Sequence, residues 1–159
     1  MKILTIASSP FLLNKTGRLN SELLQYLKSC DNEVFSAVFS HNTLYFMEES
    51  DGKYYFDIDG EKVCEIFPLS EDISKKVGSV SKLINKLQPD IIISIGDYDE
   101  TYFISTVKER DKYFNWLAIL TINNLPINEN YIEYFKLANE IIVTRKDAIK
   151  QLEDIGSKV

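Results

Sequence analysis

The sequence contains few of the residues that mark metal sites, disulfide scaffolds or membrane spans. Its single histidine, His41, excludes a histidine-rich zinc or copper site. Its two cysteines, Cys30 and Cys64, do not form a CxxC pair, and two thiols in 159 residues are typical of a reducing compartment. No apolar run reaches the roughly 18 residues that a membrane span requires. We therefore expect a cytoplasmic protein without a transmembrane segment.

Positive charge is also scarce. The formal net charge is -6, and no basic run interrupts the chain. An acidic surface repels the phosphate backbone of DNA or RNA, so we expect no nucleic-acid partner. The apolar residues amount to 45% of the chain, which is typical of a globular protein and sufficient for one sizeable core.

Short apolar runs alternate with helical patterns along most of the chain. The runs ILTIA, DIIISIG, WLAILTI and EIIVT are apolar on both faces, and the stretch 19–27 carries leucines at the spacing of one helical face. Strands of this kind, separated by helices, indicate a parallel sheet covered on both sides. The sequence therefore predicts an α/β, three-layer Rossmann-like domain with a mostly parallel sheet, formed by residues 1–159.

One segment departs from this alternation. The stretch KYYFDIDGEKVCEIFPL has two strand-like arms around Asp59-Gly60, a dipeptide typical of tight hairpins. We predict that residues 41–70 form a β-hairpin excursion on the edge of the sheet rather than a second domain.

Ligands of open α/β sheets bind outside the carboxyl ends of the strands, so the loop 8–18 is a candidate site. Gly17 would let a phosphate approach the backbone, and Lys15 or Arg18 would supply positive charge. The loop lacks a G-x-G-x-x-G pattern and a Walker P-loop, and an ordinary solvated connection explains it equally well.

A second candidate follows the strand DIIISIG. Asp97-Tyr98-Asp99 lies at the expected ligand-binding edge, and we interpret it as a site for a sugar hydroxyl rather than for a metal. His41 follows another predicted strand and has the chemistry of a general base, but no carboxylate partner is identifiable.

The order and the endings of these segments resemble the N-terminal, acceptor-side domain of GT-B glycosyltransferases of the group 1 family. KILTIASSPFLLNKTGRLNSELLQYL is similar to the family's opening strand, loop and helix, and LQPDIIISIG is similar to its PDVVHAHG-like strand. ILTINN resembles the TVHG-like strand end, and ANEIIVTRKDAIKQLEDIGSKV resembles the closing strand and helix. The resemblance covers nearly the whole chain apart from the hairpin.

The resemblance implies an enzyme that transfers a hexosyl group from a nucleotide-sugar to an acceptor hydroxyl. This domain would bind a small-molecule or glycan acceptor and close on the donor diphosphate. The matching loop assigns donor-phosphate contact to Thr16, Gly17 and Arg18. The matching strand ends assign acceptor binding to Asp97, Tyr98 and Asn123.

Two departures limit the expected activity. The family's histidines fall on Ile93, Ile95 and Asn123, and asparagine cannot take a proton near pH 7, so no catalytic base is assigned. The family's C-terminal domain, which holds the nucleotide-sugar through two glutamates eight residues apart, has no counterpart in this sequence. We expect no cofactor bound within this domain and no transfer by this chain alone.

Two alternatives remain open at this point. The loop ASSPFLLNKTGRLNSELL also resembles the phosphate loop of flavodoxin-like FMN-dependent reductases, although the aromatic, Pro-rich or Gly-rich loop for the flavin ring is missing. The second alternative is a degenerate, non-catalytic glycosyltransferase domain that binds sugars or docks a partner.

Overall fold

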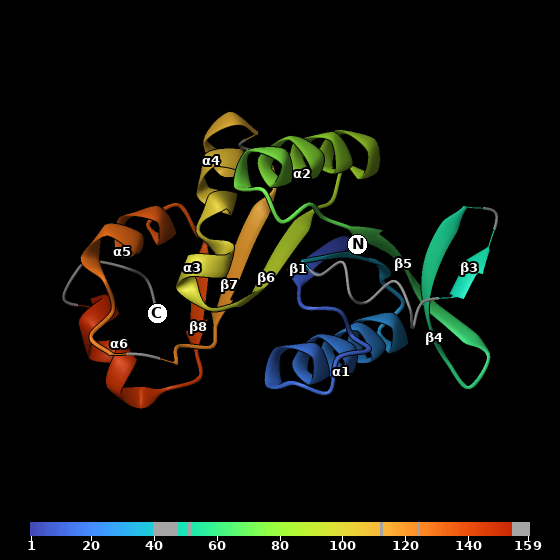
Figure 1. Ribbon diagram of the computed structural model, residues 1–159, viewed down its shortest axis with the longest axis horizontal. Coiled ribbons are helices and arrows are strands. Elements are labelled where there is room, and N and C mark those ends of the chain that lie inside the picture. The colour runs from blue at the N-terminus through green and yellow to red at the C-terminus, as the bar shows by residue number, and fades with distance from the viewer. Residues whose placement is uncertain (40–47, 51, 112, 124, 154–159) are drawn as a thin grey trace.

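A computed structural model of the chain describes residues 1–39, 48–50, 52–111, 113–123 and 125–153 (Figure 1). His41, the candidate general base, lies outside these residues. The strands are β1 (Lys2–Ala7), β2 (Glu33–Val38), β3 (Glu48–Ser50), β4 (Lys53–Ile58), β5 (Glu61–Pro68), β6 (Ile91–Gly96), β7 (Asn115–Leu120) and β8 (Glu140–Val143). The helices are α1 (Lys15–Ser29), α2 (Ile73–Leu87), α3 (Tyr98–Thr101), α4 (Phe103–Arg110), α5 (Glu129–Phe135) and α6 (Lys146–Glu153).

The described strands form one sheet in the order β3-β4-β5-β2-β1-β6-β7-β8. The six strands from β5 to β8 in this order pair in parallel, whereas β4 pairs antiparallel with both β3 and β5. The parallel part therefore has the 3-2-1-4-5-6 order of a doubly wound Rossmann fold. The predicted fold class is confirmed.

This strand order also separates two of the sequence-based interpretations. In the flavodoxin-like order, 2-1-3-4-5, the third parallel strand lies beside the first. Here the third parallel strand, β5, lies beside β2, and β6 is the other neighbour of β1. The chain therefore does not have the flavodoxin-like fold on which the flavin-reductase interpretation depends.

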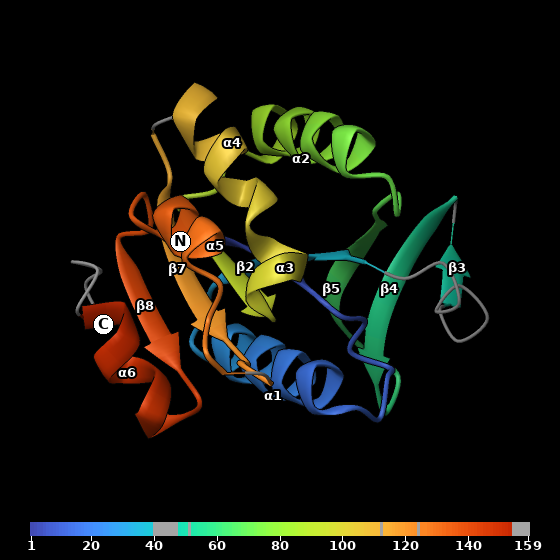
Figure 2. The ribbon, with the colours of Figure 1, turned by 60° about the vertical axis from the view of Figure 1, so that its left-hand side comes forward.

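Helices cover the sheet on both faces, as Figures 1 and 2 show. In β1, Ile3 and Ala7 face α1 and pack with its Leu24, whereas Leu4 and Ile6 belong to the core under α2, α4 and α5. Successive residues of a strand point to opposite faces, so a strand that is apolar at every position is buried on both sides. None of the helices in the described ranges is long and apolar enough to cross a membrane.

The hairpin is present, but the prediction for its second arm was wrong. β4 and β5 pair antiparallel around the turn at Asp59 and Gly60, which both have positive φ. β5, however, is not an excursion, because it pairs in parallel with β2 over Phe35–Val38. The outer edge is formed by β4 and β3, and β5 is part of the parallel core sheet.

Candidate functional site

The strand order reverses between β1 and β6, and the loops after these two strands therefore diverge at the carboxyl edge. A pocket of about 240 Å³ lies at this point. The residues that line it come from the start of α1 and from the segments after β6 and β7: Asn14, Lys15, Thr16, Glu100, Thr121 and Asn123. We call it the switch-point pocket. It coincides with the position where doubly wound sheets bind their ligands.

A larger cavity, of about 500 Å³, lies at the opposite edge, between the end of α1 and the β4–β5 turn. Its charged lining consists of Lys28, Asp31, Asp59 and Glu61. This excess of carboxylates disfavours phosphate, and the cavity is remote from the carboxyl ends of the parallel strands. Position and chemistry therefore favour the smaller switch-point pocket as the functional site.

The β1–α1 loop is shorter than predicted. The Asn14 side chain caps α1 by accepting a hydrogen bond from the Gly17 N–H at 2.7 Å, so the helix begins at Lys15. Thr16, Gly17 and Arg18 consequently lie in the first turn of α1 rather than in a loop. The Thr16 hydroxyl donates to Ser8 Oγ at 2.8 Å.

The three residues predicted to contact donor phosphate occupy different environments. Thr16 lines the pocket, Gly17 is buried, and Arg18 is exposed and does not line the pocket. A Cβ atom on Gly17 would lie 2.4 Å from the Leu12 carbonyl oxygen, so close packing already accounts for this glycine. Their contact with phosphate stays a prediction.

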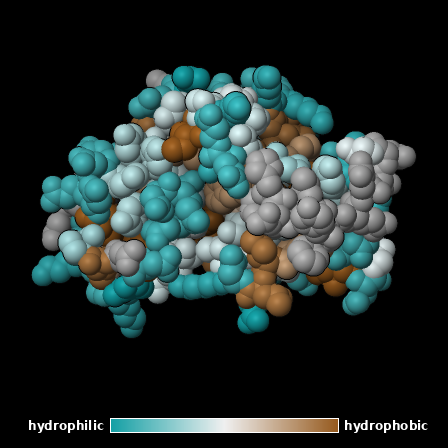
Figure 3. Space-filling model, viewed as in Figure 1, coloured by the Kyte–Doolittle hydropathy of each residue, from teal (hydrophilic) through white to brown (hydrophobic). Residues whose placement is uncertain are grey.

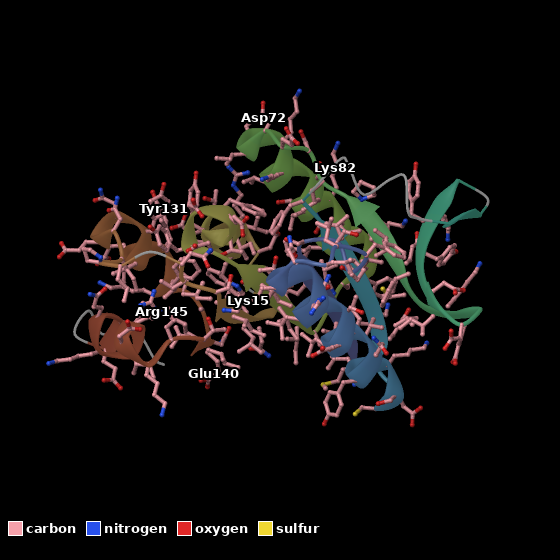
Figure 4. The ribbon with its side chains drawn as sticks, turned by 60° about the horizontal axis from the view of Figure 1, so that its bottom comes forward. Lys15, Asp72, Lys82, Tyr131, Glu140 and Arg145 are labelled. Carbon is pink, nitrogen blue, oxygen red and sulfur yellow. The ribbon has the colours of Figure 1, made fainter. Side chains whose placement is uncertain are left out.

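The sequence analysis assigned Lys15 no final role, yet it is the basic residue of the pocket. Its Nζ donates to Thr144 Oγ1 at 3.3 Å, across 129 residues of sequence. Arg145 follows, and its Nη1 donates to the Asn123 carbonyl at 3.4 Å. Figure 4 shows Lys15 on α1 and Arg145 beside α6. Arg145 could have been suspected only from its position after the last strand.

Arg145 is already paired with an acidic neighbour. Its Nε and Nη2 donate to the two carboxylate oxygens of Asp147 at 3.0 and 2.5 Å. This hydrogen bonding raises the pKa of Arg145 and lowers the pKa of Asp147. Lys15 is therefore the better candidate for binding an anion.

Two of the predicted acceptor-binding residues are in direct contact. Asp97 Oδ2 accepts hydrogen bonds from Asn123 Nδ2 at 2.9 Å and from the Asn123 N–H at 3.3 Å. Asp97 also caps α3 in a capping box with Glu100, whose Oε2 accepts from the Asp97 N–H at 3.0 Å. The carboxylate thus ties the end of β6 to the segment after β7, and their role in binding an acceptor stays a prediction.

Tyr98, the third predicted acceptor residue, faces a different group. Its ring packs on Tyr131 of α5, with ring centroids 5.0 Å apart. Burial, followed by the charges of Asp97 and Asp99, raises the pKa of its phenol. Tyr98 therefore stays a neutral hydrogen-bonding group near pH 7, and it does not line the switch-point pocket.

A buried network of polar side chains joins α1 to β1 and β2 next to the pocket. Asn20 of α1 donates to the Ser8 carbonyl at 3.0 Å and to Ser36 Oγ at 3.2 Å, and Thr5 donates to Ser36 Oγ at 2.8 Å. Through Ser8 the network reaches Thr16. Networks of this kind fix the position of the groups that they join, so α1 and the β1 end form one rigid wall of the pocket.

No family model and no curated protein matches the sequence. Among solved structures, UDP-GlcNAc 2-epimerase from Methanocaldococcus jannaschii matches with a TM-score of 0.67 and 13% identity, over 98% of this chain and 43% of that chain. A protein from Listeria monocytogenes assigned as a UDP-N-acetylglucosamine 2-epimerase matches with a TM-score of 0.64 and 15% identity, over 99% of this chain and 42% of that chain.

A third match is of similar length to this chain. The TrkA-N domain of the inner membrane protein ybaL from Escherichia coli has a TM-score of 0.52 and 10% identity, over 98% of this chain and 96% of that chain. At these identities the matches show the fold. The chain has a Rossmann-like fold and spans about two fifths of the two epimerase chains.

Proposed function

We propose that this domain binds part of a nucleotide-sugar in the switch-point pocket, as one half of a two-domain enzyme. The observation that carries the proposal is the small volume of the pocket, about 240 Å³, at the ligand-binding edge of the sheet. Sites that enclose a complete small-molecule ligand have volumes of about 300–1,000 Å³. A pocket below that range suits a sugar or a phosphate, and a facing domain would hold the remainder.

The chemistry of the lining agrees with such a ligand. Lys15 offers an ammonium group for a phosphate, together with the hydroxyls of Thr16 and Thr121. Asn123 offers an amide, and its partner Asp97 a carboxylate, for the hydroxyls of a sugar. Arg18 is exposed and lies three residues beyond Lys15 in α1, and it can reach the phosphate only if the ligand extends beyond the pocket.

Two reactions of a complete enzyme begin from such a ligand. We rank epimerisation of UDP-GlcNAc at C2 first, because both sugar-nucleotide structures that share the fold over nearly the whole chain carry that name. Hexosyl transfer to an acceptor hydroxyl, implied by the group 1 resemblance, is the second candidate. The ranking rests on analogy of fold, and the reaction is decided by assay.

Titration of the ¹⁵N-labelled chain with UDP-GlcNAc, UDP and GlcNAc-1-phosphate tests binding. We expect amide shifts at Lys15, Thr16 and Asn123, and Lys15→Ala should weaken binding by about tenfold, which is the loss of one charge-assisted contact. Lys75→Ala removes an exposed lysine from α2, away from the pocket, and serves as the control. Equal affinities of the Lys15→Ala and Lys75→Ala variants for these ligands would show that Lys15 does not contribute to binding.

Two further measurements separate the finer assignments. Weaker UDP binding by Arg18→Ala would support the donor-phosphate role predicted from the sequence, and unchanged binding would reject it. In heavy water, an epimerase that removes and returns the C2 proton incorporates deuterium without an acceptor, whereas a hexosyltransferase releases UDP only when an acceptor is present.

A further inference from the structure

A separate groove lies on the other flank of the molecule, between α2 and the end of β5. It has a volume of about 280 Å³, and its floor is apolar. The floor consists of Phe67 and Leu69, around the end of β5, and Leu83 of α2. Lys82 and Lys86 line the same groove from successive turns of α2. We call it the α2–β5 groove.

The charge on α2 is opposite to that of the chain. The helix ISKKVGSVSKLINKL contains four lysines and no acidic residue. The chain as a whole has 18 basic and 24 acidic residues, so the other segments together carry ten more acidic than basic side chains. Asp72 and Lys82 mark this helix in Figure 4, and Figure 3 shows apolar surface among the hydrophilic side chains in its region.

The two lysines of the groove repel each other. Lys82 and Lys86 are four residues apart, so they lie on one face of the helix, where like charges destabilise it. Lys86 Nζ lies 5.4 Å from the centroid of the Phe67 ring. Within the described part of the chain, no carboxylate forms an ion pair with either lysine. A ligand with two carboxylates would relieve this repulsion.

We propose that the α2–β5 groove docks an acidic segment of a partner protein. The segment would place one apolar side chain on the floor formed by Phe67, Leu69 and Leu83, with carboxylates against Lys82 and Lys86. The charge complementarity supports this occupant, because the four lysines of α2 attract acidic side chains locally although the chain has a net charge of -6. The proposal does not depend on the function proposed for the switch-point pocket.

An anionic membrane is the main competing occupant, and the shape of the surface argues against it. Membrane-surface helices insert an exposed apolar face into the lipid. Most apolar side chains of α2 are buried instead: Val77, Val80, Leu83, Ile84 and Leu87. The exposed Ile73 lies in the first turn of α2, roughly 2.5 turns from Lys82 and roughly 3.6 turns from Lys86. A concave groove can hold a protruding side chain of a partner protein, whereas a flat lipid surface cannot fill it.

Fluorescence anisotropy with a labelled peptide, EELLEELL, tests the proposal on the full chain. We expect binding that weakens by about tenfold in the double variant Lys82→Glu/Lys86→Glu and when glutamine replaces glutamate in the peptide. The matched control is Lys146→Glu/Lys150→Glu, since these lysines are also exposed and four residues apart, on α6. The charge-reversed peptide KKLLKKLL should bind the Lys82→Glu/Lys86→Glu variant more tightly than the native chain.

The outcomes separate this groove from its alternatives. Equal loss of EELLEELL binding in both double variants would show a response to net charge alone and would overturn the proposal. The same holds if no peptide binds at millimolar concentration, or if the chain binds phosphatidylglycerol vesicles through Lys82 and Lys86 but not the peptide. UDP binding measured on the same variants reports separately on the switch-point pocket.

Discussion

Gly17 and Gly78 allow the packing role of the β1–α1 junction to be tested by one pair of substitutions. Both glycines lie inside helices, at the third position of α1 and near the middle of α2. A Cβ atom on Gly17 would lie 2.4 Å from the Leu12 carbonyl oxygen and 2.7 Å from the Ser9 carbonyl oxygen. A Cβ atom on Gly78 would meet nothing within 4 Å. The same change, glycine to alanine, should therefore have opposite effects at the two positions.

The expected magnitudes follow from the contacts. Alanine is favoured over glycine in a helix by roughly 0.5–1 kcal/mol, so Gly78→Ala should stabilise the fold by about that amount. At Gly17 the same gain is opposed by a backbone shift, and overpacking of this kind costs about 1–3 kcal/mol. Both close atoms belong to backbone carbonyls and cannot rotate away, so we expect a net loss of about 2 kcal/mol for Gly17→Ala.

Urea unfolding followed by circular dichroism measures both free energies. In a chain of this length, 1 kcal/mol corresponds to about 2–4 °C in Tm, so Gly17→Ala should lower Tm by about 4–8 °C. Gly78→Ala should raise it by a few degrees. If Gly17→Ala is as stable as the native chain, α1 does not pack against the β1–α1 loop as described, and the glycine would again be a candidate for phosphate contact.

Three further predictions address the core, the α2 cap and the thiols. Ser94→Ala should lower the stability by about 1–3 kcal/mol in urea unfolding, because the buried Trp116 Nε1–H, which donates to Ser94 Oγ at 3.0 Å, loses its acceptor. Hydrogen bonds to Ser74 and to the backbone lower the pKa of Asp72, so its contribution to stability is present above pH 3.8 and disappears as the pH falls through the depressed pKa. Comparison of Tm in the native chain and in Asp72→Ala from pH 7 to pH 2 should show the two values converging. Ellman's reagent at pH 8 should modify exposed Cys30 and spare Cys64 in the folded chain, because burial raises the pKa of Cys64 to about 12; rapid modification of both thiols would contradict this.

The parallel core was predictable because its signal is local. Runs such as residues 91–96 carry apolar residues on both faces, and a strand with this pattern must be covered on both faces. The hairpin turn at Asp59-Gly60 was equally local. The position of β5 in the sheet was not predictable from local sequence. The same turn can be followed by a strand at the edge of the sheet or by a strand inside it. Only the pairing of Phe35–Val38 with Glu65–Pro68, about thirty residues away, decides between them.

The candidate site was also predictable only where its signal is local. The rule that ligands bind at the carboxyl ends of parallel strands placed Asp97 at this edge, and the family resemblance added Asn123; the two residues form a hydrogen bond there. The contact between Lys15 and Thr144 spans 129 residues, and it depends on how closely α1 and the end of β8 approach each other. Neither residue type nor spacing in the sequence contains that information.

The choice between Arg18 and Lys15 as the phosphate-binding cation depends on where α1 begins. If the helix began at the first leucine of its apolar face, Leu19, both cations would lie in a flexible loop and Arg18 could reach the pocket. The Asn14 cap instead starts the helix at Lys15. Arg18 then lies three residues along α1, about 4.5 Å further from the sheet edge, while Lys15 stays at the helix end that lines the pocket. Because Asn14 caps the helix at this point, we expect Lys15 rather than Arg18 to contact the phosphate.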